Sequence, residues 1–250
     1  MPLVPFPSPR RFGTFITRVN RFAALVLLDG EEVLAHLPNT GRMTELLVPG
    51  HPVMVVERGP ARPAQAGEPV LQPVLLGGRK TACDLVLIQY LGHWVSVDAR
   101  LPSLVVYQAL VAGVLAPWAG CVRVRREAVY GESRLDIELW RPGDRQRCLI
   151  ETKSVNLVVE GRALFPDAPT LRGARHLREL TRAVAEGLDA AVFFVIQRPD
   201  ARCFSPFEAA DPEFARALRE AAAAGVGVHA YRCLVSPEGM ALAGPVPVDL

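Results

Sequence analysis

The segment RCLIETKSV, residues 147–155, constrains the fold more than any other part of the sequence. Its mostly apolar residues predict a central strand, where charged side chains are unusual unless they are paired or functional. It nevertheless carries Glu151 and Lys153, and alternate residues of a strand lie on the same face. Lys153 is one of only two lysines among the 28 Lys and Arg residues. A lysine at this position therefore needs a chemical reason.

The preceding segment supplies another carboxylate. RLDIELW, residues 134–140, alternates as a strand, and RPGDR, residues 141–145, suits a hairpin turn. Pairing about that turn brings Asp136 close to the level of residue 150, so Asp136, Glu151 and Lys153 can converge.

A third carboxylate is predicted one strand earlier. CVRVRREAVY, residues 121–130, alternates as a strand in which Glu127 shares a face with Arg123 and Arg125. Glu127 is therefore a weaker candidate for the same cluster.

Such a cluster has a chemical use. Carboxylates at one spot repel each other and attract a hard cation, and Mg²⁺ is typically held by one or two carboxylates together with substrate phosphate and water. A metal there polarises a phosphodiester and lowers the pKa of a bound water. Lys153 can orient or deprotonate that water, whereas arginine is always protonated. The alternative is that Glu151 and Lys153 form an ordinary ion pair on a solvated strand face.

The pattern of elements predicts two domains. Short strands in the first 80 residues, with a hairpin turn at DGEE, residues 29–32, indicate a small barrel. From about residue 100 the order becomes α-β-β-β-α-β-α-β, which indicates a mixed sheet flanked by helices. We place the domains at residues 1–82 and 83–250, with a hairpin at 84–98 spanning the boundary.

Helices are predicted over 103–115, 170–187 and 211–225. Ser103 is placed to cap the first helix, and Asp211 followed by Pro212 suits the start of the third.

The bulk composition limits the class of protein. The net charge of +2 neither indicates nor excludes nucleic acid, and the five cysteines have no metal-ligand spacing. No signal segment and no membrane span is evident, so we expect a cytoplasmic protein with reduced thiols and no membrane partner.

Several motifs in order give the chain a resemblance to a known family. They are RVNRFAALV (18–26), HLPNTGRM (36–43), VYGESRLDIEL (129–139), IETKSV (150–155) and FPDAPTLRGARHLREL (165–180). The arrangement of Asp136 before Glu151-Thr-Lys153 resembles the PD-(D/E)xK nuclease core. Nearly the whole chain resembles the sugar fermentation stimulation protein A family.

The resemblance implies an N-terminal OB-fold domain and a C-terminal restriction-endonuclease-like domain that bind DNA with little sequence preference. It implies Mg²⁺ or Mn²⁺ as cofactor, with Asp136 and Glu151 as metal ligands, Lys153 as the catalytic lysine and Glu127 as a weaker ligand. The family was named for a suggested regulatory role in sugar (maltose) metabolism. One departure from the nuclease motif is Leu135, where many members have Pro.

Further residues are candidates for contacts with nucleic acid. The loop PNTGRM offers Asn39, Thr40 and Arg42, and the alternative for that loop is a tight turn. Before Asp136, Ser133 and Arg134 either position phosphate or form a strand bend.

The helix over 170–187 carries an arginine stripe, of which Arg172, with His176, lies nearest the expected site, whereas the outer arginines suit a solvated face. Phe12, Phe15 and Phe22 are expected in the core.

Two functions follow. The first is a metal-dependent DNA nuclease, and the alternative is a non-catalytic DNA-binding regulator that retains the nuclease fold. Single- and double-stranded DNA both remain open as substrates.

Overall fold

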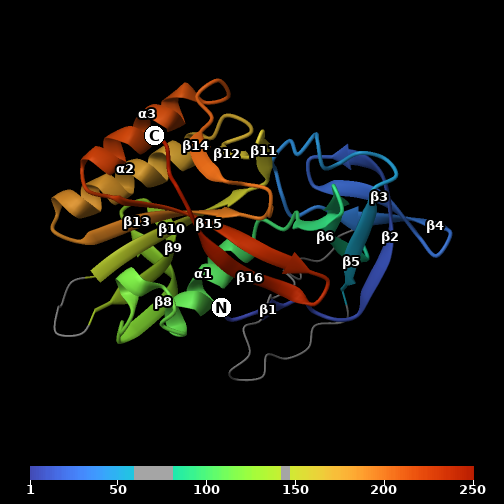
Figure 1. Cartoon of the computed structure of the whole chain (residues 1–250), viewed down its shortest axis with the longest axis horizontal. Helices are drawn as coiled ribbons and strands as arrows, with labels where there is room; N and C mark the ends of the chain where they lie inside the picture. The colour runs from blue at the N-terminus through green and yellow to red at the C-terminus, as the bar shows by residue number, and fades with distance from the viewer. Residues whose placement is uncertain (59–80, 142–146) are drawn as a thin grey trace. The chain divides into compact units, whose positions relative to one another are not determined.

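The computed structural model describes residues 1–58, 81–141 and 147–250. These residues form two compact units (Figure 1). One unit contains Pro5–Thr40 and Thr44–Asp98, and the other contains Met1–Val4, Gly41–Met43 and Ala99–Leu250. The hairpin turn predicted at 141–145 lies almost wholly outside the described residues. Within them, no helix is long and apolar enough to cross a membrane.

The N-terminal unit is a closed barrel. Its strands are β2 (Arg10–Asn20), β3 (Ala23–Leu28), β4 (Glu31–His36), β5 (Pro52–Glu57), β6 (Cys83–Tyr90) and β7 (His93–Ser96). They pair in the order β4-β3-β2-β5-β6-β7, and a parallel pairing of β4 with β6 closes the five strands β2–β6. Asp29 and Gly30, with φ of 52° and 87°, make the predicted turn between β3 and β4. The barrel expected from the sequence is confirmed.

The division between the units differs from the predicted boundary at residues 82 and 83. Strand β6 begins at Cys83 and pairs with β5 and β7, so the hairpin that was expected to span the boundary belongs wholly to the barrel. The barrel unit runs to Asp98. The physical reason is that β6 supplies the edge that meets β4, without which the barrel would stay open.

Two of the three phenylalanines expected in the core are exposed. Phe15 is buried, but Phe12 and Phe22 are 53% and 54% exposed. Phe12 and Phe15 lie three apart on β2, so they point to opposite faces of the strand. The ring of Phe12 instead lies 6.0 Å from that of Trp94.

The C-terminal unit is built on a mixed seven-stranded sheet. Its order is β1-β16-β15-β13-β10-β9-β8, with β10, β13 and β15 parallel at its centre. The bounds are β1 (Val4–Pro5), β8 (Arg123–Tyr130), β9 (Ser133–Trp140), β10 (Arg147–Val155), β13 (Asp189–Ile196), β15 (Gly227–Ser236) and β16 (Gly239–Val246). The predicted mixed sheet is confirmed.

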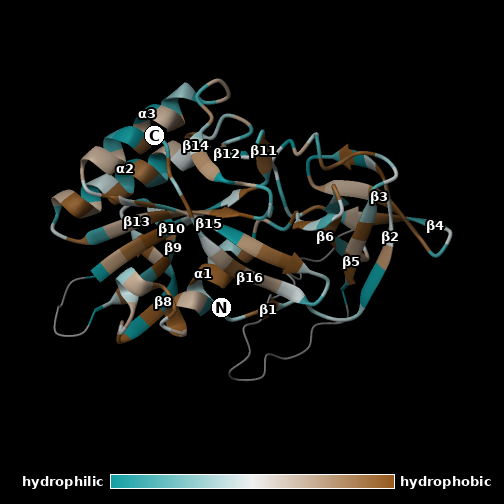
Figure 2. Ribbon diagram, viewed as in Figure 1, coloured by the Kyte–Doolittle hydropathy of each residue, from teal (hydrophilic) through white to brown (hydrophobic). Residues whose placement is uncertain are grey.

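Helices cover this sheet on both faces. Helix α1 (Leu101–Val111) packs against β8, β9, β10 and β16, while α2 (Leu171–Ala185) and α3 (Pro212–Ala223) pack on each other across the opposite face (Figure 1). The crossovers from β10 through α2 to β13 and from β13 through α3 to β15 produce the parallel centre. Figure 2 shows polar and apolar residues mixed along α2 and α3, as expected of helices with one buried face.

Besides the two-residue strand β1, the sequence missed four strands of this unit. A small separate sheet contains β11 (Leu157–Val159), β12 (Arg162–Phe165) and β14 (Cys203–Pro206), and β16 extends the main sheet beside β15. Strands of three or four residues are too short to show an alternating pattern. The sequence of β16, GMALAGPV, contains two glycines and a proline, which are typical of loops.

Helix α1 begins earlier than predicted. It starts at Leu101, and Ser103 is not its cap, because the Ser103 hydroxyl donates to the carbonyl of Arg100 at 3.3 Å. Pro102 is tolerated in the first helical turn, where amide groups have no partner within the helix. The other two helices follow the predicted positions, with Thr170 and Asp211 as side-chain caps.

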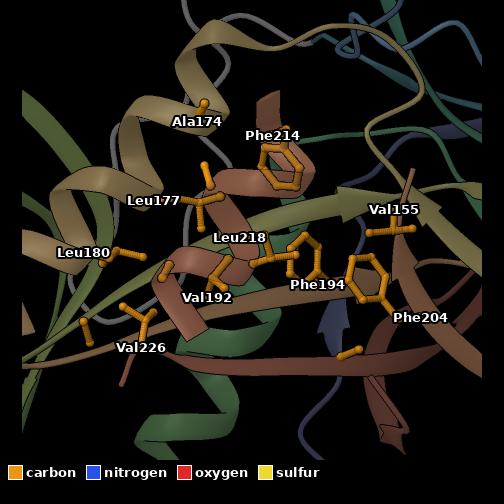
Figure 3. Close-up of a cluster of buried hydrophobic side chains, with 14 of the residues drawn as sticks. Val155, Ala174, Leu177, Leu180, Val192, Phe194, Phe204, Phe214, Leu218 and Val226 are labelled. Atoms are coloured by element: carbon orange, nitrogen blue, oxygen red, sulfur yellow. The ribbon is translucent and has the colours of Figure 1, made fainter. Parts of the chain in front are cut away.

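The core of the C-terminal unit lies between the sheet and the helices α2 and α3 (Figure 3). Phe194 of β13 stacks on Phe204 with ring centroids 3.9 Å apart and meets Phe214 of α3 edge-on at 6.3 Å. Leu177 of α2 and Leu218 of α3 are also fully buried there. This core holds α2 against β10.

Replacing Phe194 with alanine tests that core. We expect F194A to lower the free energy of unfolding by about 3–5 kcal/mol, because the cavity has no neighbour free to fill it. Urea unfolding monitored by circular dichroism measures this. The control, exposed Phe12→Ala, is expected to change stability far less, and an equal loss in both variants would contradict the placement of the core.

An aromatic cluster stabilises the opposite face. His229 of β15 lies 4.8 Å from the ring of Trp118 and 5.1 Å from that of Phe193. Burial lowers the pKa of His229 below its ordinary value of 6.5, because charging the ring here loses hydration. The unfolded state therefore binds the proton more tightly than the folded state does.

Acid should destabilise the C-terminal unit through His229. As pH falls below about 6.5, we expect stability to decrease until the folded-state pKa is passed. His229→Phe should remove this part of the pH dependence, measured as unfolding free energy against pH. A control at exposed His93 of β7, His93→Asn, should retain it. An unchanged profile in His229→Phe would contradict the assignment.

Candidate functional site

The hairpin partners β9 and β10 bring the predicted site residues to one level. Their ladder runs from Arg147 opposite Trp140 to Ile150 opposite Ile137. The ladder ends there, and continuing its register by one step would set Glu151 opposite Asp136. The convergence of Asp136, Glu151 and Lys153 that the sequence predicted is therefore present in the backbone register.

Asp136 is held by the residue between Glu151 and Lys153. Its Oδ2 accepts hydrogen bonds from the amide of Thr152 at 2.8 Å and from the Thr152 hydroxyl at 2.5 Å. The ladder with β9 ends at Ile150, so this amide is available to the carboxylate. Both bonds use Oδ2, which leaves Oδ1 for another ligand.

Glu151 is the buried centre of the site. Its carboxylate Oε1 accepts from Lys153 Nζ at 2.6 Å and from His176 Nδ1 of α2. Glu151 is 4% exposed, and Lys153 is 9% exposed. Among the described residues, Glu151 Oε2 is buried and has no hydrogen-bond partner.

The two carboxylates have opposite pKa shifts. Burial, followed by the negative charge of Glu151, raises the pKa of Asp136. Burial would also raise the pKa of Glu151, but the positive charge of Lys153 and the hydrogen bond from His176 outweigh it, so the pKa of Glu151 is lowered. Glu151 is thus the ionised partner, and a cation would relieve the repulsion that disfavours charge on Asp136.

These oxygens fit a hard divalent cation. A buried, unpartnered acceptor is rare because leaving it unsatisfied costs about 1–3 kcal/mol. Glu151 Oε2 is such an acceptor, and Asp136 Oδ1 is on the neighbouring strand. One or two carboxylates are what Mg²⁺ commonly takes from a protein, with water and substrate completing its shell.

The third predicted carboxylate does not join the cluster. Glu127 lies at the level of Asp136 on β8, between the pairs Arg126–Ile137 and Ala128–Leu135. It is exposed, and its carboxylate pairs with Arg134 at 3.3 Å. Its φ of 59° breaks the alternation of side chains that the prediction assumed. In the described part of the chain, no three His, Cys, Asp or Glu side chains are grouped to hold a metal.

Two residues predicted to touch nucleic acid are buried instead. His176 and Ser133 are 2% and 3% exposed, so neither side chain reaches a phosphate backbone. The hydrophobic packing of α2 turns His176 toward Glu151, and Ser133 lies at the start of β9. Arg134 is exposed but is paired with Glu127.

Arg172 is exposed on the first turn of α2, and its Nε donates to His176 Nε2 at 3.3 Å. The outer arginines of that helix pair with acidic neighbours, as a solvated face predicts: Arg178 with Glu213 and Arg182 with Glu179.

The PNTGRM loop is divided between the two units. Asn39, which is nearly buried, and exposed Thr40 belong to the barrel unit, where Asn39 accepts from Arg18 through its carbonyl at 3.3 Å. Arg42 belongs to the C-terminal unit, and its amide donates to the carboxylate of Asp167 at 2.6 Å. Its side chain is exposed and remains a candidate for contact with a phosphate.

Thr152 and the contact of His176 with Glu151 were not predicted from the sequence. Thr152 lies between Glu151 and Lys153 in the strand. Its hydroxyl, a hydrogen-bond donor beside two charged residues, was the feature of the sequence that could have indicated a contact with Asp136. Arg172 and His176 are four apart on a helix, a spacing that brings side chains together. That spacing could have predicted the contact between Arg172 and His176. No sequence pattern shows that His176 also contacts Glu151.

Comparison with known proteins identifies the family of the chain and supports its two-domain fold. Residues 100–239 match the family model described as "Sugar fermentation stimulation protein RE domain", and residues 16–97 match "SfsA N-terminal OB domain". The chain belongs to the SfsA family. The first range lies within the C-terminal unit, and the second lies within the barrel unit except for Gly41–Met43, so the two ranges support a division near Asp98. The expected OB-like barrel and nuclease-like α/β domain are both confirmed.

Two relatives in the SfsA family match over nearly their full lengths. A sugar fermentation stimulation protein homolog of Symbiobacterium thermophilum is 48% identical, covering 98% of this chain and 97% of the relative. A homolog of Moorella thermoacetica is 44% identical, with 99% and 100% covered. A solved structure described as Pyrococcus furiosus SfsA in complex with Ca²⁺ is 29% identical, covers all of both chains and has a TM-score of 0.85.

The buried ion pair can be tested without DNA. Lys153→Met leaves Glu151 buried without its lysine, so we expect a loss of about 3 kcal/mol at pH 7. Glu151 then titrates at a higher pH than in the wild type, because burial is less opposed. Urea unfolding against pH measures both effects.

The sign of the pH dependence follows from that change. The lowered pKa of Glu151 stabilises the wild type above the ordinary value of 4.5, and this stability is lost as pH falls through the folded-state pKa. The gap between wild type and K153M should therefore narrow in acid. The double variant E151Q/K153M should lose less unfolding free energy than K153M alone, because no charge is left buried without a partner. Equal losses in the two variants would contradict the ion pair.

Proposed function

We propose that this protein is a cytoplasmic, divalent-metal-dependent DNA nuclease that hydrolyses phosphodiester bonds with little sequence preference. One observation carries the proposal. Asp136 and Glu151 lie on adjacent strands beside Lys153, each next to the last paired residues Ile137 and Ile150, and Glu151 Oε2 is buried without a partner among the described residues.

Asp136 and Glu151 are the residues that would hold Mg²⁺ or Mn²⁺. The relative from Pyrococcus furiosus, described as a complex with Ca²⁺, supports a divalent cation in this family. When bound, the cation would polarise the phosphodiester and lower the pKa of water. Thr152 holds Asp136 through Oδ2, so Oδ1 would be the oxygen that coordinates the cation.

Lys153 has a role that arginine does not fill. Its ammonium group has three donors, and one is used by Glu151 at 2.6 Å. The remaining donors can orient an attacking water or bind the charge that develops on the phosphate. A planar guanidinium is larger and does not release a proton, so an arginine here would lose the option of acting as a base.

The barrel offers a surface for unpaired bases. Phe12 is 53% exposed and lies 6.0 Å from Trp94 across the barrel surface. Aromatic side chains of OB barrels stack on bases whatever their sequence. This supports single-stranded DNA as a ligand with little sequence preference.

A second candidate function is a non-catalytic DNA-binding regulator of sugar (maltose) metabolism. The name shared by the relatives, which refers to sugar fermentation, favours it. A pure binding protein has no chemical need for two opposed carboxylates and a buried lysine, so we place it second.

Cleavage of DNA by purified protein tests the proposal. We expect single- or double-stranded DNA to be cut in Mg²⁺ or Mn²⁺, and K153M or Asp136→Asn to lower the rate by about 100-fold or more. Chelation of the metal should abolish cleavage. Electrophoresis of labelled DNA measures the products, with binding followed separately by fluorescence anisotropy.

An exposed carboxylate of the same unit provides the control. Glu208→Gln removes a charge paired with Arg219 and should cleave as the wild type does. Binding without cleavage in either metal would favour the regulator, and cleavage that survives both K153M and D136N would exclude this site as the catalytic centre.

A further inference from the structure

His176 connects helix α2 to the central strand. Its side chain is 2% exposed, and its Nδ1 contacts Glu151 Oε1. On the other side of the ring, Arg172 Nε points at His176 Nε2 at 3.3 Å. The two helical residues are one turn apart, so a continuous row runs from Arg172 through His176 to Glu151.

The partners of the ring determine which nitrogen carries the proton. An ionised carboxylate only accepts hydrogen bonds, so Nδ1 must donate to Glu151. A guanidinium only donates, so Nε2 must accept from Arg172. Arg172 and Glu151 together therefore select the imidazole with its hydrogen on Nδ1.

The same contacts fix the direction of the Glu151 carboxylate. Lys153 and His176 both donate to Oε1, which leaves Oε2 as the atom that faces away from these donors. Among the described residues this oxygen is buried and lacks a hydrogen-bond partner. Because Lys153 from the strand and His176 from the helix both bind Oε1, the Glu151 carboxylate is fixed and Oε2 has one orientation.

Helix α2 is itself firmly placed. The Thr170 side chain accepts from the amide of Gly173 and caps the helix, while the Thr170 amide donates to Asp211, the cap of α3. Leu177, next to His176, is fully buried in the core. Arg172 and His176 are therefore held on the first turns of a helix whose start is fixed.

We propose that Arg172 and His176 are positioning residues that hold Glu151 for a divalent cation. This inference deepens the proposed function and rests on its divalent-cation site. It assigns to His176 an indirect role, as an orienting partner of a ligand, and it removes Arg172 from the set of direct DNA contacts. Orienting partners of this kind typically change metal affinity by about 10–100-fold when they are lost.

Substitutions of His176 that move the donor test this role. His176→Asn places an amide near the position of Nδ1, whereas His176→Gln places it near Nε2, and His176→Leu has no donor. We expect Asn to recover most of the wild-type affinity for Mn²⁺ and both Gln and Leu to weaken it about 10-fold or more, measured by isothermal titration calorimetry on the full chain. Thermal unfolding without metal checks that each variant is folded.

Arginine substitutions on the same helix provide a matched pair. Arg172→Met removes the donor to His176 and should weaken Mn²⁺ binding, while Arg175→Met removes an equal charge from an exposed neighbour and should not. Long-range proton–nitrogen NMR of the histidines gives a readout independent of metal. The histidine signal that is absent from the spectrum of His176→Asn belongs to His176. In the wild type, that signal should show the proton on Nδ1.

The outcomes separate the two proposals. Mn²⁺ binding that is unchanged in folded His176→Gln and Arg172→Met, or a proton on Nε2 of His176, overturns the positioning role and leaves the nuclease proposal standing. Failure of the wild type to bind any Mn²⁺ overturns both. If His176→Asn keeps the affinity for Mn²⁺, His176→Gln and His176→Leu lose it, and the wild type does not cleave DNA, the positioning role is supported and the nuclease proposal is overturned.

Discussion

The buried contact between Glu151 and Lys153 is the interaction on which the C-terminal unit depends. Two opposite charges 2.6 Å apart lie on a strand whose other residues are almost all buried. Moving ions of this size out of water costs several kcal/mol each, and their attraction compensates only when the geometry is good and other hydrogen bonds are made. Here His176 supplies one more bond to Glu151, and Thr152 secures the neighbouring Asp136. An apolar pair of similar volume can be as stable, but removing one partner of the ion pair leaves the other charge buried alone.

The sheet and its helices serve to hold this contact. Strand β10 pairs with β9 on one side and with β13 on the other, so its backbone is fixed on both edges before any side chain is considered. The packing of Phe194 against Phe204 and Phe214 keeps α2 and α3 on the face from which His176 reaches Glu151. Core packing, helix capping and the ion pair are therefore parts of one arrangement around the Glu151 carboxylate.

The central strand and its hairpin could be predicted from the sequence, because each is a continuous alternating pattern of several residues. The strand at 147–155 has the same bounds in the structure, and the hairpin register sets Asp136 opposite Glu151, within one residue of the expected level. Two predictions were wrong, one because the backbone departs from alternation and the other because it follows alternation. The left-handed backbone at Glu127 removed it from the cluster, and the three-residue spacing of Phe12 and Phe15 put one ring in the core and the other on the surface.

By itself, the sequence determined that a hairpin carries Asp136 and Glu151 to one level beside a lysine, because strand alternation and turn chemistry depend only on neighbouring residues. Only the tertiary structure decided what surrounds them. The contact of His176 with Glu151 joins residues 25 apart through the packing of α2, and the closure of the barrel by β4 and β6 assigns residues 83–98 to the N-terminal unit. Such contacts depend on burial between distant segments, which no local pattern of residues specifies.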